Sequence, residues 1–257
     1  MPQPIVLAFV LIHGLAALWA VAGRGRRSGW NALIFVLIGA GIVATYSRGP
    51  WVAAAALALL LWGAPRLGTT GLRLLAAAVV LGLPVALLSG LGDEVFDALK
   101  NLFGTSAADA GSIDYRQELL ETARALIAQS PWTGVPDYAS HMQHLIQGEG
   151  IIDIVNAYVG ITLAAGVVGL VAFVLPLLLS VLRRLHALRH ADPQAIEARD
   201  IDIALFSLTL VSLMVLVTTS SFSVMPMLLL LLAALPPACA TIGTDRGAPL
   251  RPMRHMR

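Results

Sequence analysis

Residues Val155 to Leu182 read VNAYVGITLAAGVVGLVAFVLPLLLSVL, a run of 28 residues without one acidic or basic side chain. A helix needs roughly 20 mainly apolar residues to cross a bilayer, so this run is long enough. The rest of the chain has the same character, with 58% hydrophobic and only 12% charged residues. In soluble proteins, about a quarter of the residues are charged. The sequence therefore predicts an all-α, polytopic membrane protein forming a single integral-membrane domain over residues 1–257.

Six other apolar segments have the composition of membrane spans. Together with the first they predict about seven transmembrane helices, at 4–22, 30–46, 51–64, 72–91, 155–182, 201–219 and 222–241. The third is short and is expected to end near the interface. The single cysteine, Cys239, excludes a disulfide framework and a thiolate metal cluster.

The charged residues are segregated along the chain. Ten of the fifteen acids lie between Asp93 and Asp153, so residues 92–150 are expected to form one large water-facing loop. If seven helices alternate, thirteen of the seventeen basic residues fall on the opposite face, which the positive-inside rule makes cytoplasmic. The N-terminus and the 92–150 loop are then periplasmic, and the C-terminus is cytoplasmic. Four basic residues depart from the rule: Arg48, Lys100, Arg116 and Arg124.

Within the loop, residues 114–129 predict an amphipathic helix. Apolar side chains recur on one helical face at Tyr115, Leu119, Ala123, Leu126 and Ile127. Ser112 or Asp114 is expected to cap its start, and Pro131 with Gly134 to end it. Such a helix can lie on the membrane surface and cover the bundle.

Arg48 stands between two apolar runs, in the sequence Tyr46-Ser47-Arg48-Gly49-Pro50. An arginine at mid-membrane costs roughly 2.5 to 3.5 kcal/mol, so its presence needs a reason. Two readings stay open: an interfacial anchor between Tyr46 and Trp51, or a binding group for a phosphorylated ligand. The periplasmic position favours the second, because anchoring arginines are expected on the cytoplasmic side.

Arg116 opens the amphipathic helix without an acidic neighbour one turn away, whereas Arg124 has Glu121 three residues back and is expected to form a surface pair. Unpaired guanidinium groups suit a diphosphate, because their planar fork binds phosphate oxygens in a bidentate manner and stays charged. Arg48 and Arg116 are therefore the principal candidates for binding a diphosphate, and Arg124 is a weaker one.

Several residues before the fifth span can act as an acid or base. Asp153 and Asn156 are expected one helical turn apart near the outer boundary, where Asp153 either serves as a general base or caps the helix. Glu149 is a further carboxylate. His141 and His144 have the spacing of a metal pair, but two ligands are few, and a solvated loop explains them as well. No metal and no cofactor are predicted.

Five short motifs, in this order, resemble a known family. They are Ser47-Arg48-Gly49, Tyr115-Arg116, Ser130-Pro131-Trp132-Thr133-Gly134, Val155-Asn156-Ala157-Tyr158 and Ala165-Gly166-Val167-Val168-Gly169-Leu170. The pattern over residues 30–182 is similar to the shared domain of O-antigen ligases and O-antigen polymerases, which are membrane glycosyltransferases of the bacterial envelope.

The resemblance implies a protein of the bacterial inner membrane that transfers a glycan from a polyprenyl-diphosphate carrier at the periplasmic face. The acceptor would be a lipid, a saccharide or a protein, and no nucleic acid is involved. Arg48 and Arg116 match the arginines that hold the diphosphate, with Ser47, Tyr115, Asn156 and Tyr158 as supporting residues. Many members have a histidine directly before the asparagine, where this chain has Val155. The base is therefore left open among Asp153, Glu149, His141 and His144.

Two other functions fit the same arginines. A flippase or transporter of polyprenyl-linked glycans would hold the diphosphate only in passing, and it predicts polar residues at mid-membrane depth. Most helix interiors are Ala, Leu and Val, which favours the enzyme. The third possibility is a non-catalytic partner in an envelope polysaccharide complex.

Overall fold

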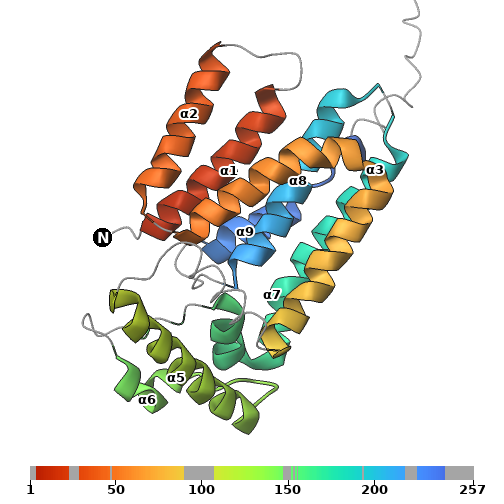
Figure 1. The fold of residues 1–257 in the computed structure, drawn as a ribbon. Coiled ribbons are helices and arrows are strands. Elements are labelled where there is room, and N and C mark those ends of the chain that lie inside the picture. Colours follow the sequence, from red (N-terminus) through yellow and green to blue (C-terminus); the bar gives the residue numbers. More distant parts are fainter. Residues whose placement is uncertain are drawn as a thin grey trace, which may run out of the picture.

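The computed structural model describes residues 4–22, 29–46, 48–89, 107–146, 152, 154, 156–192, 194–217 and 225–240. For residues 48, 83–89, 107–114, 116, 117 and 225 it describes the backbone alone. Throughout this part of the chain, all regular structure is helical, as the sequence predicted. Six helices form a bundle, and the others cover one end of it (Figure 1). The bundle helices are α1 (Pro4–Ala22), α2 (Gly29–Ala44), α3 (Arg48–Ser89), α7 (Ala157–His190), α8 (Ile196–Val215) and α9 (Met225–Ala234).

Three helical segments within the described residues are long and apolar enough to cross a membrane: Pro4–Ala22, Gly49–Gly82 and Ala157–His190. Shorter apolar helices occupy Gly29–Ala44 and Pro226–Ala240. Large apolar side chains point outward from the bundle, among them Val36, Leu59 and Leu81, which are each about two-thirds exposed. An apolar exterior of this kind suits a surface that faces lipid acyl chains. The chain is a membrane-embedded protein, and the seven-span arrangement stays a prediction.

Helix α3 covers the two spans predicted at 51–64 and 72–91. No loop separates them, because only Gly68 leaves helical geometry, with φ 63° and ψ 178°. A positive φ suits glycine, which has no Cβ to collide with the backbone. The two arms of α3 therefore meet at an angle at this residue (Figure 1).

Helix α7 is longer than the span predicted at 155–182. It begins at Ala157, runs to His190, and breaks at Gly166, where φ is 66° and ψ is −169°. The predicted end at 182 was wrong, because Arg183, Arg184 and Arg189 form the last turns of α7. Arginine, leucine and alanine dominate these turns, and all three are good helix formers.

Helix α8 is the most enclosed helix of the bundle. Its residues from Asp202 to Leu213 are buried apart from the partly buried Leu205. They pack in two apolar clusters with residues of α1, α3, α7 and α9. The bundle core is therefore built around α8, and it includes the polar side chains of Asp202, Ser207, Thr209 and Ser212.

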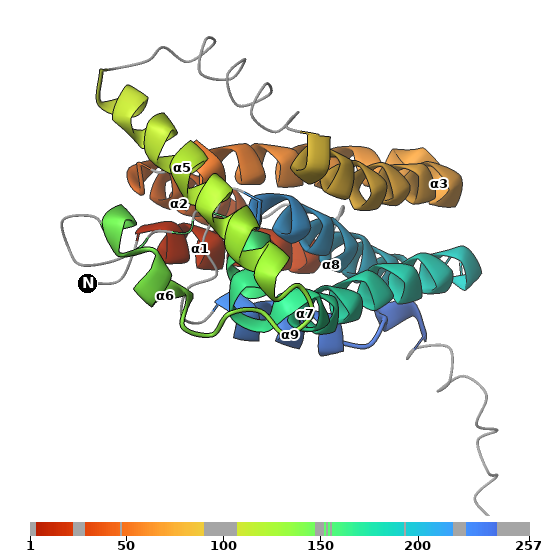
Figure 2. The ribbon, with the colours of Figure 1, turned by 90° about the horizontal axis from the view of Figure 1, so that it is seen from below.

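The loop predicted at 92–150 contains α5 (Ala107–Gln129), α6 (Tyr138–His141) and the 3₁₀ helix η1 (Gln143–Leu145). The amphipathic face is confirmed: Leu119, Ala123 and Leu126 are buried, and Tyr115 and Ile127 pack beside them. The start at 114 was wrong, because α5 begins seven residues earlier, so Ser112 and Asp114 lie inside the helix and do not cap it. Seen from below, α5 crosses the end of the bundle (Figure 2).

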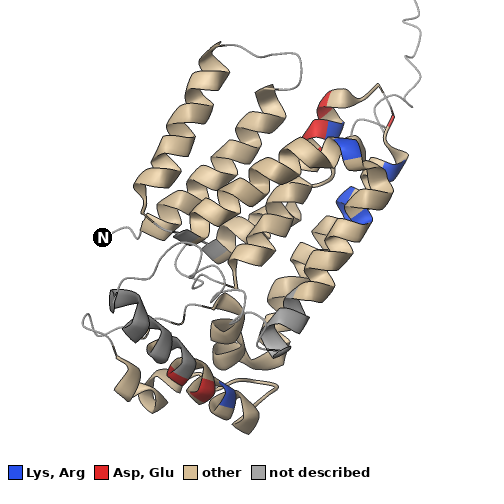
Figure 3. Ribbon diagram, in the orientation of Figure 1, with Lys and Arg blue, Asp and Glu red and all other residues tan. Residues whose placement is uncertain are grey.

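Charged side chains lie at the two ends of the molecule. The described basic residues of the bundle gather at the end away from α5 (Figure 3). They belong to the bend of α3, the end of α7 and the start of α8: Arg66, Arg73, Arg183, Arg184, Arg189 and Arg199. The structure thus brings together basic residues that the sequence assigned to one face, and it places α5 opposite them.

Candidate functional site

The two principal arginine candidates belong to elements at the α5 end of the molecule. Arg48 is the first residue of α3, and Arg116 lies in α5. The backbone of each is described, and their side chains lie outside the described residues. Ser47, Glu149 and Asp153 also lie outside them. Figure 1 shows that α3 begins at the end of the bundle that α5 covers.

The turn that precedes Arg48 is tightly fixed. The Thr45 hydroxyl donates to the Ile42 carbonyl (2.7 Å), and the Trp51 indole N–H donates to the same oxygen (3.0 Å). These bonds occupy a carbonyl at the end of α2, where helices leave such groups without intrahelical partners. Tyr46, which follows Thr45, has a φ of 50°, which is uncommon for a residue with a side chain. The start of α3 is therefore held against the end of α2 through specific contacts.

Asn156 caps α7. Its side-chain oxygen accepts from the backbone N–H groups of Tyr158 (3.0 Å) and Val159 (3.3 Å). Its own backbone is extended, and Ile154 before it is also outside the helix. Helix α7 begins only at Ala157, with Asn156 as its cap, and Asp153 lies outside the described residues.

Tyr158 anchors the start of α7 to the end of α8. Its buried hydroxyl donates to the carbonyl of Leu213 (2.7 Å). The backbone N–H of Ala157 donates to the carbonyl of Leu216 (2.9 Å). One turn later, the Thr162 hydroxyl donates to the Tyr158 carbonyl (2.7 Å). The side-chain oxygen of Asn156 and the hydroxyl of Tyr158 thus hold backbone groups at the start of α7 and the end of α8.

The segment after α5 docks into the break of α7. The N–H of Val135 donates to the carbonyl of Leu163 (2.6 Å), and the N–H of Val167 donates to the carbonyl of Pro131 (2.8 Å). A Cβ on Gly134 would lie 2.6 Å from the Leu163 oxygen, and one on Gly166 would collide with the Trp132 carbonyl. Glycine at both positions allows this backbone contact. Gly166 thereby admits the loop at 131–135 into the break of α7.

The loop at 131–135 provides hydrogen-bond partners for the backbone at the break of α7. Interrupting a helix frees backbone groups that must find partners away from water. Here the loop supplies those partners, so two of the five family-like motifs, at 130–134 and 165–170, bind each other. The contact fixes the end of α5 relative to the start of α7.

The histidine candidates lie on the exposed side of this unit. His141 ends α6 and is exposed. The Nε2 atom of His144 is 3.9 Å from Glu118 Oε1, with both side chains more than half exposed. Among the described residues, no group of three histidine, cysteine or acidic side chains can hold a metal ion. The solvated reading therefore fits both histidines.

Arg124 is exposed on α5, as is Glu121. The surface pair predicted between them is not formed, since no ion pair joins these two described side chains. Arg124 faces solvent from a helix whose opposite face is packed.

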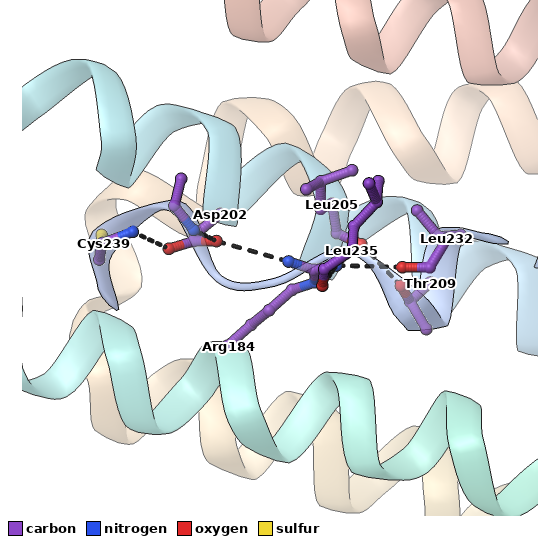
Figure 4. Close-up of polar contacts among 8 residues, drawn as sticks. Arg184, Asp202, Leu205, Thr209, Leu232, Leu235 and Cys239 are labelled. Carbon is purple, nitrogen blue, oxygen red and sulfur yellow. Dashed lines mark hydrogen bonds and ion pairs between the residues drawn. The ribbon is translucent and has the colours of Figure 1, made fainter. Parts of the chain in front are cut away.

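Sequence reasoning missed a buried ion pair. Arg184 Nη1 lies 3.5 Å from Asp202 Oδ1, and both side chains are fully buried (Figure 4). Arg184 Nη2 donates to the carbonyls of Leu232 (3.1 Å) and Leu235 (3.2 Å). The Asp202 carboxylate accepts from the N–H groups of Ala238 (2.9 Å) and Cys239 (2.8 Å). The signal was an aspartate inside the otherwise apolar span from 201 to 219.

Arg48 and Arg116 come from different segments of the chain, and both belong to elements at the α5 end. An arginine binds phosphate oxygens in pairs, and fixed positive groups stabilise the charge on a departing phosphate. The buried pair of Arg184 lies elsewhere, joining α7, α8 and the chain around α9.

No curated protein and no solved structure shows significant similarity to the chain. The profile of the O-antigen ligase family matches residues 33–174, just over half of the chain. The match includes Arg48, Arg116, the loop at 130–135, the Asn156 cap and the Gly166 break. Motifs far apart in the matched sequence thus converge on the α5 end of the structure, and the chain belongs to the O-antigen ligase family.

Proposed function

We propose that this protein is a membrane glycosyltransferase that moves a glycan from a polyprenyl-diphosphate carrier to a lipid, saccharide or protein acceptor. The family match over residues 33–174 carries the proposal. It is supported by the position of Arg48 and Arg116 on elements of the α5 end.

In the proposed reaction, an acceptor hydroxyl or amine attacks the sugar carbon bound to the diphosphate. The bond from that carbon to the diphosphate oxygen breaks, and the polyprenyl diphosphate leaves. Negative charge grows on the leaving oxygen, so Arg48 and Arg116 would stabilise the transition state more than the ground state. Val155 stands where many members have a histidine, so the acceptor proton would pass to another group. Asp153, Glu149, His141 and His144 are the candidates for this base.

The same proposal gives the protein an orientation. The basic end, with Arg66, Arg73, Arg183, Arg189 and Arg199, would face the cytoplasm according to the positive-inside rule. The α5 end would then face the periplasm of a bacterial inner membrane. The polyprenyl chain would lie in the bilayer beside the apolar exterior of the bundle, with its diphosphate at the interface.

Purified protein supplied with a polyprenyl-diphosphate glycan and an acceptor tests the proposal. Wild type should produce transferred glycan and free polyprenyl diphosphate. Arg48→Ala and Arg116→Ala should each lose about a hundredfold or more in rate, the usual cost of removing one preorganised charge-stabilising group. Arg124→Ala measures the third candidate, and Arg189→Ala is the matched control, an exposed arginine at the other end.

Undiminished transfer in both Arg48→Ala and Arg116→Ala would refute the diphosphate site. Movement of the glycan lipid across proteoliposomes, without any transfer, would instead identify a flippase. Absence of both activities in correctly folded wild type would favour the non-catalytic partner.

A further inference from the structure

A cavity of about 660 Å³ opens where the last turns of α7 meet the chain after α9. Its α7 wall carries three nitrogen-bearing side chains, Arg183, His186 and His190, and all three are exposed. Cys239 and Ala240 line the opposite side. Among the described residues that line it, none is an aspartate or a glutamate.

The three side chains lie on one stripe of α7. Spacings of three and four residues place neighbours on the same helical face, so Arg183, His186 and His190 follow one another along it. The rings of His186 and His190 have centroids 4.7 Å apart. From Arg183 to His190 the rise is roughly 10 Å, at about 1.5 Å per residue. The wall can therefore present several donors to one anionic group.

Arg183 and its neighbour Arg184 have different environments. Arg184 points into the core and is paired with Asp202, so its charge is neutralised. Arg183 is exposed and lines the cavity. A guanidinium and two imidazoles suit a phosphate, since a guanidinium carries five N–H donors and a neutral imidazole carries one.

An apolar stripe continues from the cavity along the same face of α7. Leu175, Leu179 and Leu182 are 47%, 39% and 60% exposed, and their spacing of four and three residues aligns them. They lead away from the helix end, toward the middle of the apolar span. A ligand that fits both parts has an anionic head and an apolar chain.

We propose that this cavity binds the headgroup of an anionic phospholipid, with an acyl chain along Leu182, Leu179 and Leu175. The phosphate lies against Arg183, His186 and His190. Basic pockets between membrane helices on the cytoplasmic side bind anionic headgroups in this way. The end of α7 that lines the cavity lies where the basic residues of the bundle gather (Figure 3), and such residues are expected near lipid headgroups. The site lies at the opposite end from Arg48 and Arg116 and does not depend on the proposed reaction.

The test is retention of lipid by the purified protein, measured by native mass spectrometry after exchange into phosphatidylglycerol or phosphatidylcholine. Wild type should retain phosphatidylglycerol in preference to phosphatidylcholine. Arg183→Gln should weaken phosphatidylglycerol binding about fivefold, since one basic residue near a membrane surface contributes about 1 kcal/mol. Arg189→Gln is the control, because this exposed arginine of the same helix does not line the cavity.

Equal loss in Arg183→Gln and Arg189→Gln would overturn the proposal, because it would indicate general surface charge. Displacement of bound phosphatidylglycerol by inorganic phosphate at equal concentration would also overturn it. The stripe of leucines would then contribute nothing to binding. Ala240→Trp provides a second variant that fills the cavity and leaves every charge in place. It should reduce retention of phosphatidylglycerol, and unchanged retention in this variant would contradict the site.

Discussion

Arg184 is costly to bury, because a guanidinium is removed entirely from solvent beside a single carboxylate. Breaking a buried pair on one side leaves the other charge without compensation, which costs about 3 to 5 kcal/mol. We therefore expect Arg184→Met to lower the stability of the protein in detergent by this amount. The measurement is the free energy of unfolding or, where unfolding is irreversible, the thermal midpoint.

Asp202→Asn serves to separate the interaction energy of the pair from a general loss of stability. The amide carries no charge and keeps one acceptor oxygen, so it can accept from the N–H group of Ala238 or of Cys239, where the carboxylate accepts from both. The double variant Arg184→Met/Asp202→Asn should lose clearly less than the sum of the two single losses, as expected for directly interacting residues. Strict additivity would show that the pair contributes no interaction energy. Arg189→Met, in the same helix but exposed, should change stability within about 0.5 kcal/mol.

Tyr158→Phe tests the anchor between α7 and α8. The variant removes the hydroxyl that donates to Leu213 and leaves a buried carbonyl without this partner. A loss of about 1 to 3 kcal/mol is expected. Tyr46→Phe is the control, because Tyr46 is 88% exposed. Equal stability of the two variants would rule out a structural role for the bond.

Among the helices and loops, the contact between the loop at 131–135 and the break of α7 gives a specific prediction for the stability of glycine variants. Gly166→Ala adds a Cβ that collides with the Trp132 carbonyl, at a positive φ that alanine disfavours. Gly134→Ala meets the backbone of Leu163 and Ala165 in the same way. Each should lose more than about 2 kcal/mol of stability, because backbone cannot shift as a flexible side chain can.

Gly160→Ala is the matched control for this pair. Gly160 lies in the same helix, and its Cβ would meet only Ile154, at an ordinary distance of 3.6 Å. In a helix interior, alanine is favoured over glycine by about 1 kcal/mol, so this variant should be neutral or stabilising. A loss in Gly160→Ala as large as in Gly166→Ala would contradict the proposed backbone contact.

Local sequence pattern predicted some elements well and others poorly, for physical reasons. The packed face of α5 was predicted because Leu119, Ala123 and Leu126 repeat at helical spacing. The start of α5 was missed because Ala107 to Ile113 has no apolar periodicity, although alanine is the best helix former. The break at Gly166 depends on a loop thirty residues earlier in the chain, which no local pattern contains.

The site was predicted less completely than the fold. Sequence and resemblance identified the segments that meet at the α5 end, including the Asn156 and Tyr158 motif. Their geometry was not accessible, because the role of Asn156 as a cap follows from where α7 begins. The predicted span ended before Arg184, since a run of arginines after an apolar span resembles a topology signal. Its burial is decided by Asp202, on another helix.

At the scale of the whole molecule, the separation of charge predicts one orientation. Single cysteines at the exposed residues Ala128 and Gln194, in a Cys239→Ser background, report on the two ends. A membrane-impermeant thiol reagent added to intact bacterial cells with a permeable outer membrane should label position 128. Position 194 should react only after the inner membrane is opened. The reverse pattern would place α5 in the cytoplasm and contradict the proposed site.

The proposed function requires the glycan donor to bind at the α5 end. Photo-crosslinking with a polyprenyl-diphosphate glycan that carries a reactive group beside the diphosphate, followed by peptide mapping, locates the bound donor. Label is expected on the peptides that contain Arg48 and Arg116, reduced in Arg48→Ala and Arg116→Ala and unchanged in Arg189→Ala. Label confined to residues 182–190 and 237–240 at the basic end, or unaffected by the first two substitutions, would contradict it.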